Sequence, residues 1–132
     1  MLSPGKFQFK LSPGRRLTSN SPEVGIGYEA GAGGAITQDT NRTTGVTLNN
    51  VTGQITLISA AGSATPASFT VTNSSVADGD VIILNQNSGT DLYEIHVTDV
   101  AAGSFQITSF TTGGTTTEQP VFNFAIIKGV SN

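Results

Sequence analysis

The residues able to do chemistry in this chain are few and widely spaced. The 132 residues include one histidine, His96, and no cysteine, so disulfides, thiolate metal sites and cysteine nucleophiles are excluded. A catalytic triad needs a nucleophile, an imidazole and an orienting acid within hydrogen-bond reach, and no G-x-S-x-G motif supplies an activated serine. His96 alternates with Glu94 and Thr98 on the polar face of a predicted strand. We therefore interpret it as a surface histidine and predict no catalytic residue and no enzyme.

Cation and phosphate sites are equally weakly supported. Asp78-Gly79-Asp80 offers carboxylate oxygens for calcium, but the further acids and the closing glutamate of an EF-hand loop are missing. A turn before a strand is sufficient to explain these residues. Gly31-Ala32-Gly33-Gly34 lacks the Lys-Ser/Thr that follows a phosphate-binding loop. No metal site and no cofactor are predicted.

Charge divides the chain into two parts. Residues 1–16 contain four basic residues and no acid, whereas residues 17–132 contain two basic residues and all nine acids. The net charges are therefore +4 and −7. A basic segment on an acidic body indicates a negatively charged partner for that segment, or else a solubilising tail. The acidic body would repel phosphates, so no nucleic-acid partner is expected.

The first 33 residues are typical of an extended arm. Leu-Ser-Pro-Gly occurs at 2–5 and again at 11–14, and Pro-Gly favours a type II turn. Between the turns, residues 6–10 alternate apolar and polar side chains as a short strand does. The glycines at 25, 27, 31, 33 and 34 are expected to form a flexible hinge. We therefore predict an arm and hinge over 1–33 and a folded domain over 34–132.

The domain shows short strands at nearly regular spacing and no helical period. Turn sequences such as Asn87-Ser88-Gly89 separate the strands. This pattern predicts an all-β fold, a single small β-sandwich or jelly-roll-like domain. The strands are expected at 44–48, 54–59, 68–73, 80–86, 91–98, 104–110 and 120–128.

Alternation within these strands assigns two sets of apolar side chains. The first set is the predicted core: Phe69, Val71, Tyr93, Ile95, Val97, Phe105, Ile107, Phe122, Phe124 and Ile126. The second set falls on the opposite faces, where it needs cover either from a second layer or from another subunit. As a predicted oligomer interface it comprises Ile58, Ile82, Leu84, Phe110 and Ile127.

No targeting segment is expected. No stretch is apolar over 18 residues, so no transmembrane helix and no membrane partner are predicted. The start, Met1-Leu2-Ser3-Pro4-Gly5, lacks the apolar core of a signal peptide. Synthesis in a bacterial cytoplasm is the expectation.

Three segments resemble small virion proteins of tailed bacteriophages, including cyanophages. They are GAGGAITQDTNRTTGVTLNNVTGQITL (31–57), SFTVTNSSVADGDVIILN (68–85) and GSFQITSFTTGGTTTEQPVFNFAIIKG (103–129). The resemblance covers about three quarters of the chain and leaves out residues 1–30. It implies an all-β domain on the virion, as a capsid decoration (cement) protein or a fibre tip, with no catalytic residues.

The resulting expectation is a decoration protein on the capsid surface that binds the major capsid protein as a homotrimer. Its capsid-binding residues are expected in the arm: Lys6, Phe7, Phe9, Lys10, Arg15 and Arg16. The alternative is a fibre or adhesin domain that binds host-surface glycan. Aromatic platforms for sugars are scarce, since there is no Trp and only two tyrosines, Tyr28 and Tyr93. A small hydrolase is the third and least supported reading.

Overall fold

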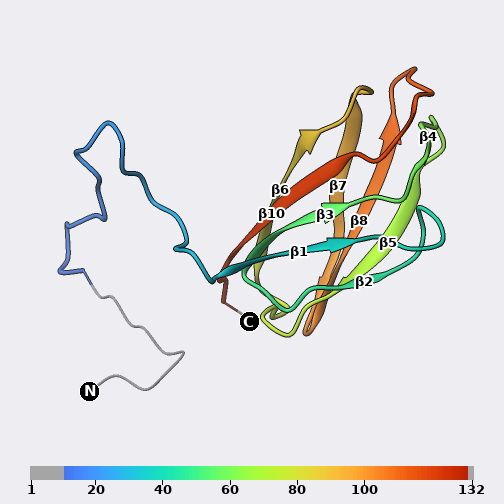
Figure 1. The fold of residues 1–132 in the computed structure, drawn as a ribbon. Helices are drawn as coiled ribbons and strands as arrows, with labels where there is room; N and C mark the ends of the chain where they lie inside the picture. The colour runs from blue at the N-terminus through green and yellow to red at the C-terminus, as the bar shows by residue number, and fades with distance from the viewer. Residues whose placement is uncertain (1–10, 131–132) are drawn as a thin grey trace.

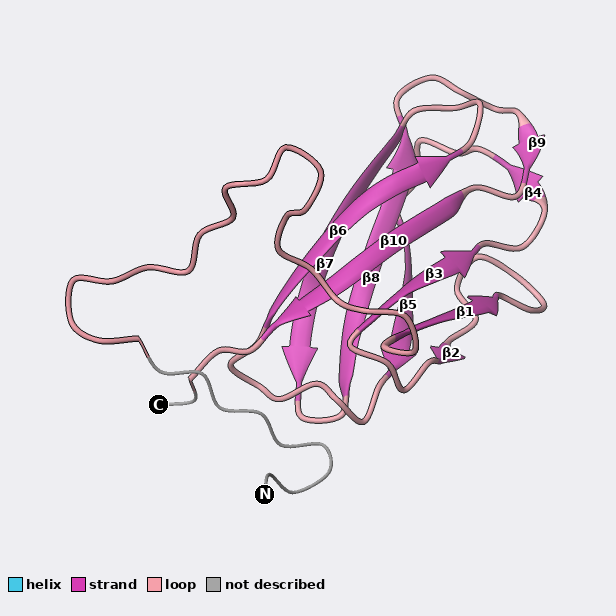
Figure 2. Ribbon diagram, turned by 60° about the vertical axis from the view of Figure 1, so that its left-hand side comes forward, coloured by secondary structure: helices cyan, strands magenta, loops and turns pink. Residues whose placement is uncertain are grey.

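The computed structural model describes residues 11–130, which contain ten β-strands and no helix. Sheet A has the order β1 (Gly33–Thr37), β3 (Thr52–Thr56), β10 (Val121–Ile127), β6 (Val81–Ser88). Sheet B has the order β2 (Val46–Thr47), β5 (Ala67–Thr72), β8 (Ser104–Thr111), β7 (Tyr93–Ala101). A two-stranded ribbon of β4 (Ala60–Ala61) and β9 (Thr117–Glu118) lies at one end (Figure 2). The predicted all-β single domain is confirmed.

Each of the seven strands predicted from the sequence overlaps an observed one. The sequence did not indicate the two-residue strands β4 and β9 or the longer strand β1. It missed β1 because Gly33 and Gly34 were assigned to the hinge. Those two glycines are paired with Thr52 and Gly53 of β3, so the hinge assignment is wrong for them and the domain begins at Gly33. A Cβ at Gly34 would lie 2.8 Å from Leu48 Cδ1, so close packing and not flexibility requires glycine there.

The sheets are mixed because the chain alternates between them near one edge. β1 and β3 lie in sheet A, with β2 in sheet B between them along the chain. The chain reverses its direction each time it crosses to the other sheet. When it returns to a sheet, the new strand therefore runs parallel to the strand that it left there. Accordingly β1 pairs with β3 in parallel and β2 pairs with β5 in parallel, while β10 and β8 pair antiparallel with their neighbours.

The core lies between the two sheets and is dominated by aromatic residues. Phe105 of sheet B and Phe124 of sheet A have ring centroids 5.3 Å apart, and Tyr93 meets Phe122 edge-on at 5.7 Å. Eight of the ten predicted core residues are buried, while Ile95 and Val97 are partly buried and pack against the others. The remaining buried apolar residues of the core are Val46, Leu48, Ile55, Leu57, Val76 and Ile82.

Buried polar side chains hold the loops at the β4–β9 end. Arg42 donates from Nε to the carbonyl of Ile58 at 2.8 Å, and from Nη2 to the carbonyls of Ala60 and Glu118 at 2.9 and 3.0 Å. Gln38, only 1% exposed, donates to the carbonyl of Thr44 at 2.9 Å. These bonds join the loop around Arg42 to Ile58 and to the β4–β9 ribbon.

Candidate functional site

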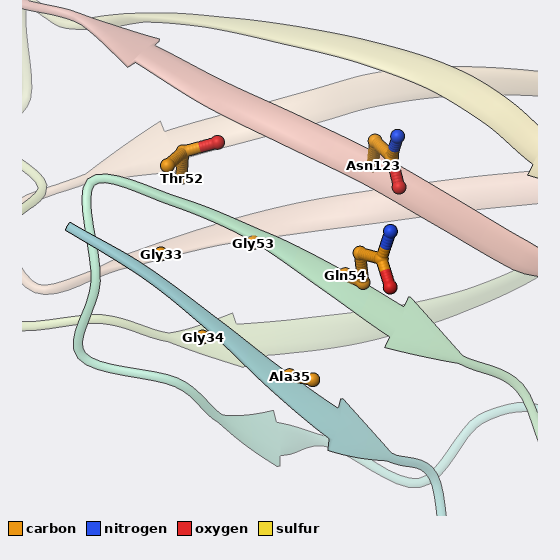
Figure 3. A pocket seen from close by; sticks show the side chains of 7 residues that line it. All are labelled: Gly33, Gly34, Ala35, Thr52, Gly53, Gln54 and Asn123. Atoms are coloured by element: carbon orange, nitrogen blue, oxygen red, sulfur yellow. The ribbon is translucent and has the colours of Figure 1, made fainter. Parts of the chain in front are cut away.

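The candidate binding site is a shallow groove on the outer face of sheet A, open to solvent, with a volume of about 530 Å³ (Figure 3). It crosses β1, β3 and β10. Its lining residues are Gly33, Gly34, Ala35, Thr52, Gly53, Gln54 and Asn123. Neither a charged nor an aromatic side chain lines it.

The groove exists because the part of β1 that lines it consists of two glycines and an alanine. Ala35 lies opposite Gln54 of β3, which in turn lies opposite Asn123 of β10. The side chains of Gln54 and Asn123 therefore lie beside the small residue Ala35, and Figure 3 shows the two amides next to one another. Asn123 Oδ1 is buried and has no hydrogen-bond partner. A buried carbonyl oxygen without a partner is costly, so Asn123 Oδ1 is an unsatisfied acceptor beside this wall of the groove, covered from solvent in this structure.

The chemistry of the groove is hydrogen bonding without charge. An amide both donates and accepts, and the hydroxyl of Thr52 already donates to the carbonyl of Phe124 at 2.8 Å. Such a surface suits a neutral polar ligand or an extended polypeptide. None of its residues is a nucleophile activated by a base.

His96 lies on the outer face of sheet B, as the sequence predicted for a surface histidine. Its Nε2 is 3.9 Å from Glu94 Oε2, and its side chain is 59% exposed. The imidazole stacks on Phe110 with centroids 6.5 Å apart. Around it the face carries hydroxyls bonded to one another: Thr108 Oγ1 is 2.8 Å from Thr98 Oγ1 and 2.7 Å from Ser68 Oγ.

In the Asp78-Gly79-Asp80 turn, the Asp80 side chain forms hydrogen bonds within the protein. Its buried carboxylate accepts from the backbone N–H groups of Ala77 at 2.8 Å and Gly129 at 3.0 Å, and from the ammonium of Lys128. Burial by itself raises the pKa of Asp80, but these donors outweigh it, so the pKa is lowered from its ordinary value of 3.8. The turn thus ties the start of β6 to the end of β10. No cluster of three or more His, Cys, Asp or Glu suited to a metal occurs within residues 11–130.

The predicted capsid-binding residues fall into two groups. Lys6, Phe7, Phe9 and Lys10 lie outside the described residues. Arg15 and Arg16 lie in the extended segment 11–30, every residue of which is exposed. In Figure 1 this segment runs away from the sheets and rejoins them beside the C-terminus. The hydroxyl of Tyr28 donates to the carbonyl of Ile126 there.

The predicted oligomer-interface set is divided by the structure. Ile82 is 9% exposed and belongs to the core, and Leu84 packs against it, so these two are already covered within the domain and their assignment needs correction. From the sequence, Ile82 and Leu84 were assigned to the outer face of their strand. In β6 these two residues point inward, and Val81 and Ile83 point outward. Ile58 and Phe110 are half-buried, and Ile127 is 53% exposed.

Sequence reasoning missed the exposed apolar patch that results. Val81 and Ile83 are 56% and 50% exposed, and strand pairing places Ile127 opposite Val81. We call Val81, Ile83 and Ile127 the β6 patch. All four residues from 81 to 84 are apolar. Alternation therefore does not show which of them face outward, because the run fits the core equally well in either register.

The comparisons with known proteins add nothing to these observations. No protein-family model matches the chain, and the searches of curated proteins and of solved structures found no match. In residues 11–130, no helix is long and apolar enough to cross a membrane.

Proposed function

We propose that this protein is a capsid decoration protein of a tailed bacteriophage. The observation that carries the proposal is the contrast between the β-sandwich and residues 11–30, which are all exposed and leave it at one end (Figure 1). In the sequence, residues 1–16 carry a net charge of +4. The resemblance of residues 31–129 to small phage virion proteins supports the same assignment.

In this proposal the body is the displayed domain and the arm is the attachment. The arm has four basic residues. Its described part, residues 11–30, is exposed throughout, so it presents side chains and backbone to a shell. Exposed ion pairs contribute only about 0–1 kcal/mol each. Apolar contacts of the arm and pairing of its backbone with a sheet edge therefore carry much of the affinity, and several arms in one oligomer add avidity.

The experiment compares the full chain with residues 31–132 in co-sedimentation with undecorated heads of the phage that encodes it. The full chain is expected to pellet with the heads, and the truncated chain is expected to stay in the supernatant while keeping its β-type circular dichroism. Equal decoration by both chains would show that the body and not the arm is the attachment.

A second candidate function is a fibre-tip domain that binds a host-surface glycan. The groove of sheet A favours it, because the amides of Gln54 and Asn123 suit sugar hydroxyls. Retention of the chain on immobilised host polysaccharide, lost in a Gln54→Ala, Asn123→Ala variant, would favour this function over decoration.

A further inference from the structure

The sandwich has one sheet edge without the usual protection against strand addition. β6 is an edge strand of sheet A, and among the described residues it pairs with β10 alone. Its pairing is regular from Val81 to Gln86, and no charge or proline occurs from Val81 to Ser88. Natural sheets protect exposed edges with charges, prolines, bulges or short strands.

The other three edges are charged and irregular, as in β7, or shorter than the eight residues of β6, as in β1 and β2. β7, the edge of sheet B on the same side, contains Glu94 and Asp99 and an irregularity between Val97 and Asp99. β2 has only two residues, and β1 has five and lies beside β2. The unprotected edge therefore coincides with the β6 patch, where Val81 and Ile83 alternate with inward-facing residues.

We propose that the β6 edge accepts residues 6–10, Lys6-Phe7-Gln8-Phe9-Lys10, from a second copy of this chain. Phe7 and Phe9 are two residues apart, as are Val81 and Ile83, so an added strand would set two aromatic side chains beside the β6 patch on one face. This periodicity match is the first argument for the occupant.

Charge is the second argument. The opposite face of the added strand carries Lys6, Gln8 and Lys10. Glu94 and Asp99 of β7 lie on the outer face of sheet B, so the attraction comes from the net charges of the two parts and not from these two carboxylates. A +4 segment and a −7 body attract one another whether or not any shell is present.

Reach is the third argument, and it favours a second copy over the same chain. Tyr28 is held at the carbonyl of Ile126, close to Ile127 of the β6 patch. The eighteen residues from Leu11 to Tyr28 can span up to about 60 Å when extended. Residues 11–27 are fully exposed and run outward, which carries their N-terminal end away from the sheets of their own chain (Figure 1).

Such an arm-to-edge contact is head-to-tail. It closes into a ring when successive copies are related by a rotation, and a rotation of one third of a turn gives the trimer expected from the sequence. The inference concerns copies in solution and does not rest on the proposed function. On a shell it would assign residues 6–10 to the neighbouring copy and leave Arg15 and Arg16 for the capsid.

The test uses the absence of native cysteine. A Phe9→Cys chain is mixed with an Ile83→Cys chain and oxidised, and the matched control mixes Phe9→Cys with Thr70→Cys, an exposed position on the outer face of sheet B. We expect a disulfide-linked heterodimer at least tenfold more abundant with Ile83→Cys. Equal cross-linking of both partners would overturn the proposal.

Association is measured in parallel by sedimentation velocity. Ile83→Lys and the Phe7→Ala, Phe9→Ala variant are each expected to weaken self-association at least tenfold, and Thr70→Lys is expected to leave it unchanged. Circular dichroism checks that each variant is folded. A full-length chain that stays monomeric at about 100 µM, well above a Kd of about 1 µM, would contradict the second-copy assignment. So would a Phe9→Cys, Ile83→Cys double variant whose disulfide forms within single chains.

Discussion

The guanidinium of Arg42 lies over the ring of Tyr93, 5.8 Å from its centroid, and joins a loop to the aromatic core. The same side chain donates to the carbonyls of Ile58, Ala60 and Glu118. One residue thus combines a cation–π contact with hydrogen bonds to three backbone carbonyls. Sequence reasoning assigned no role to this charge.

Arg42→Ala is expected to lower the free energy of unfolding by about 2–3 kcal/mol, because acceptors to a charged donor lose their partner. Arg42→Lys is expected to recover less than half of this loss, because an ammonium lacks the planar fork that reaches several carbonyls. Urea unfolding measures both. The control is Arg16→Ala, at an exposed position, which should change stability by less than about 0.5 kcal/mol. Equal stability of the Arg42→Ala and Arg16→Ala variants would contradict the assigned role.

Gly53→Ala is expected to destabilise the domain by about 1–3 kcal/mol, because added volume in a packed interior forces neighbours to move. A Cβ there would lie 2.8 Å from the carbonyl oxygen of Gly34 and 2.7 Å from Leu48 Cδ2. Gly25→Ala is the matched control, since nothing lies within 4 Å of its Cβ position. Thermal unfolding of both variants tests the pair, and a lower Tm for Gly25→Ala than for Gly53→Ala would reverse the argument.

The Asp80–Lys128 pair predicts a pH dependence of stability. Because the pKa of Asp80 is lowered in the folded state, ionised Asp80 stabilises the fold above its ordinary pKa of 3.8. This contribution is lost as the pH falls below 3.8 through the folded-state pKa. The stability difference between the wild-type chain and Asp80→Asn should therefore be largest above about pH 5 and shrink as acid is added.

Lys128→Met provides the complementary variant for this pair. Without the ammonium, burial raises the pKa of Asp80 while two backbone donors remain. Acid destabilisation should then begin at a higher pH than in the wild-type chain. Urea unfolding between about pH 3 and pH 7 covers the range in which carboxylates titrate, about 3–5, and a plateau above it. Identical pH profiles of stability for both chains would contradict the expected shift to higher pH.

Sequence periodicity predicted the strands because alternation is a local property. Phe69, Phe105 and Phe124 each sit in a segment whose polar neighbours fix the inward face, and all three are buried. The failures share a different cause. β1 carries Gly34, whose need for close packing is set by Asn50 and Leu48, residues outside its own strand.

The candidate site was less predictable than the fold. The groove forms because Ala35, Gln54 and Asn123 are neighbours across three paired strands. The order in which strands pair cannot be predicted from the local spacing of residues. The face error in β6 has a similar origin, since a run of four apolar residues fits either register until β10 sets it. Arg42 was overlooked because its acceptors are backbone carbonyls, which leave no mark in the sequence.

For decoration of the shell, apolar side chains of the arm are predicted to matter more than its charges. Phe7→Ala with Phe9→Ala should weaken binding to undecorated heads more than Arg15→Ala with Arg16→Ala. Separating the copies removes the avidity of several arms, whereas each exposed ion pair contributes only about 0–1 kcal/mol. Binding isotherms at 50 mM and 300 mM salt separate the terms (Debye lengths of about 14 and 6 Å). The reverse order, with strong salt sensitivity, would show that charge dominates.

The central claim is that this chain sits on the outside of a phage head. Cryo-EM of the virion whose genome encodes it tests that claim most directly. The account predicts density on the outer capsid surface that fits the two-sheet body of residues 33–130, with the arm running along the major capsid protein. Density for the body at the tail fibres alone, or none on the virion, would contradict it.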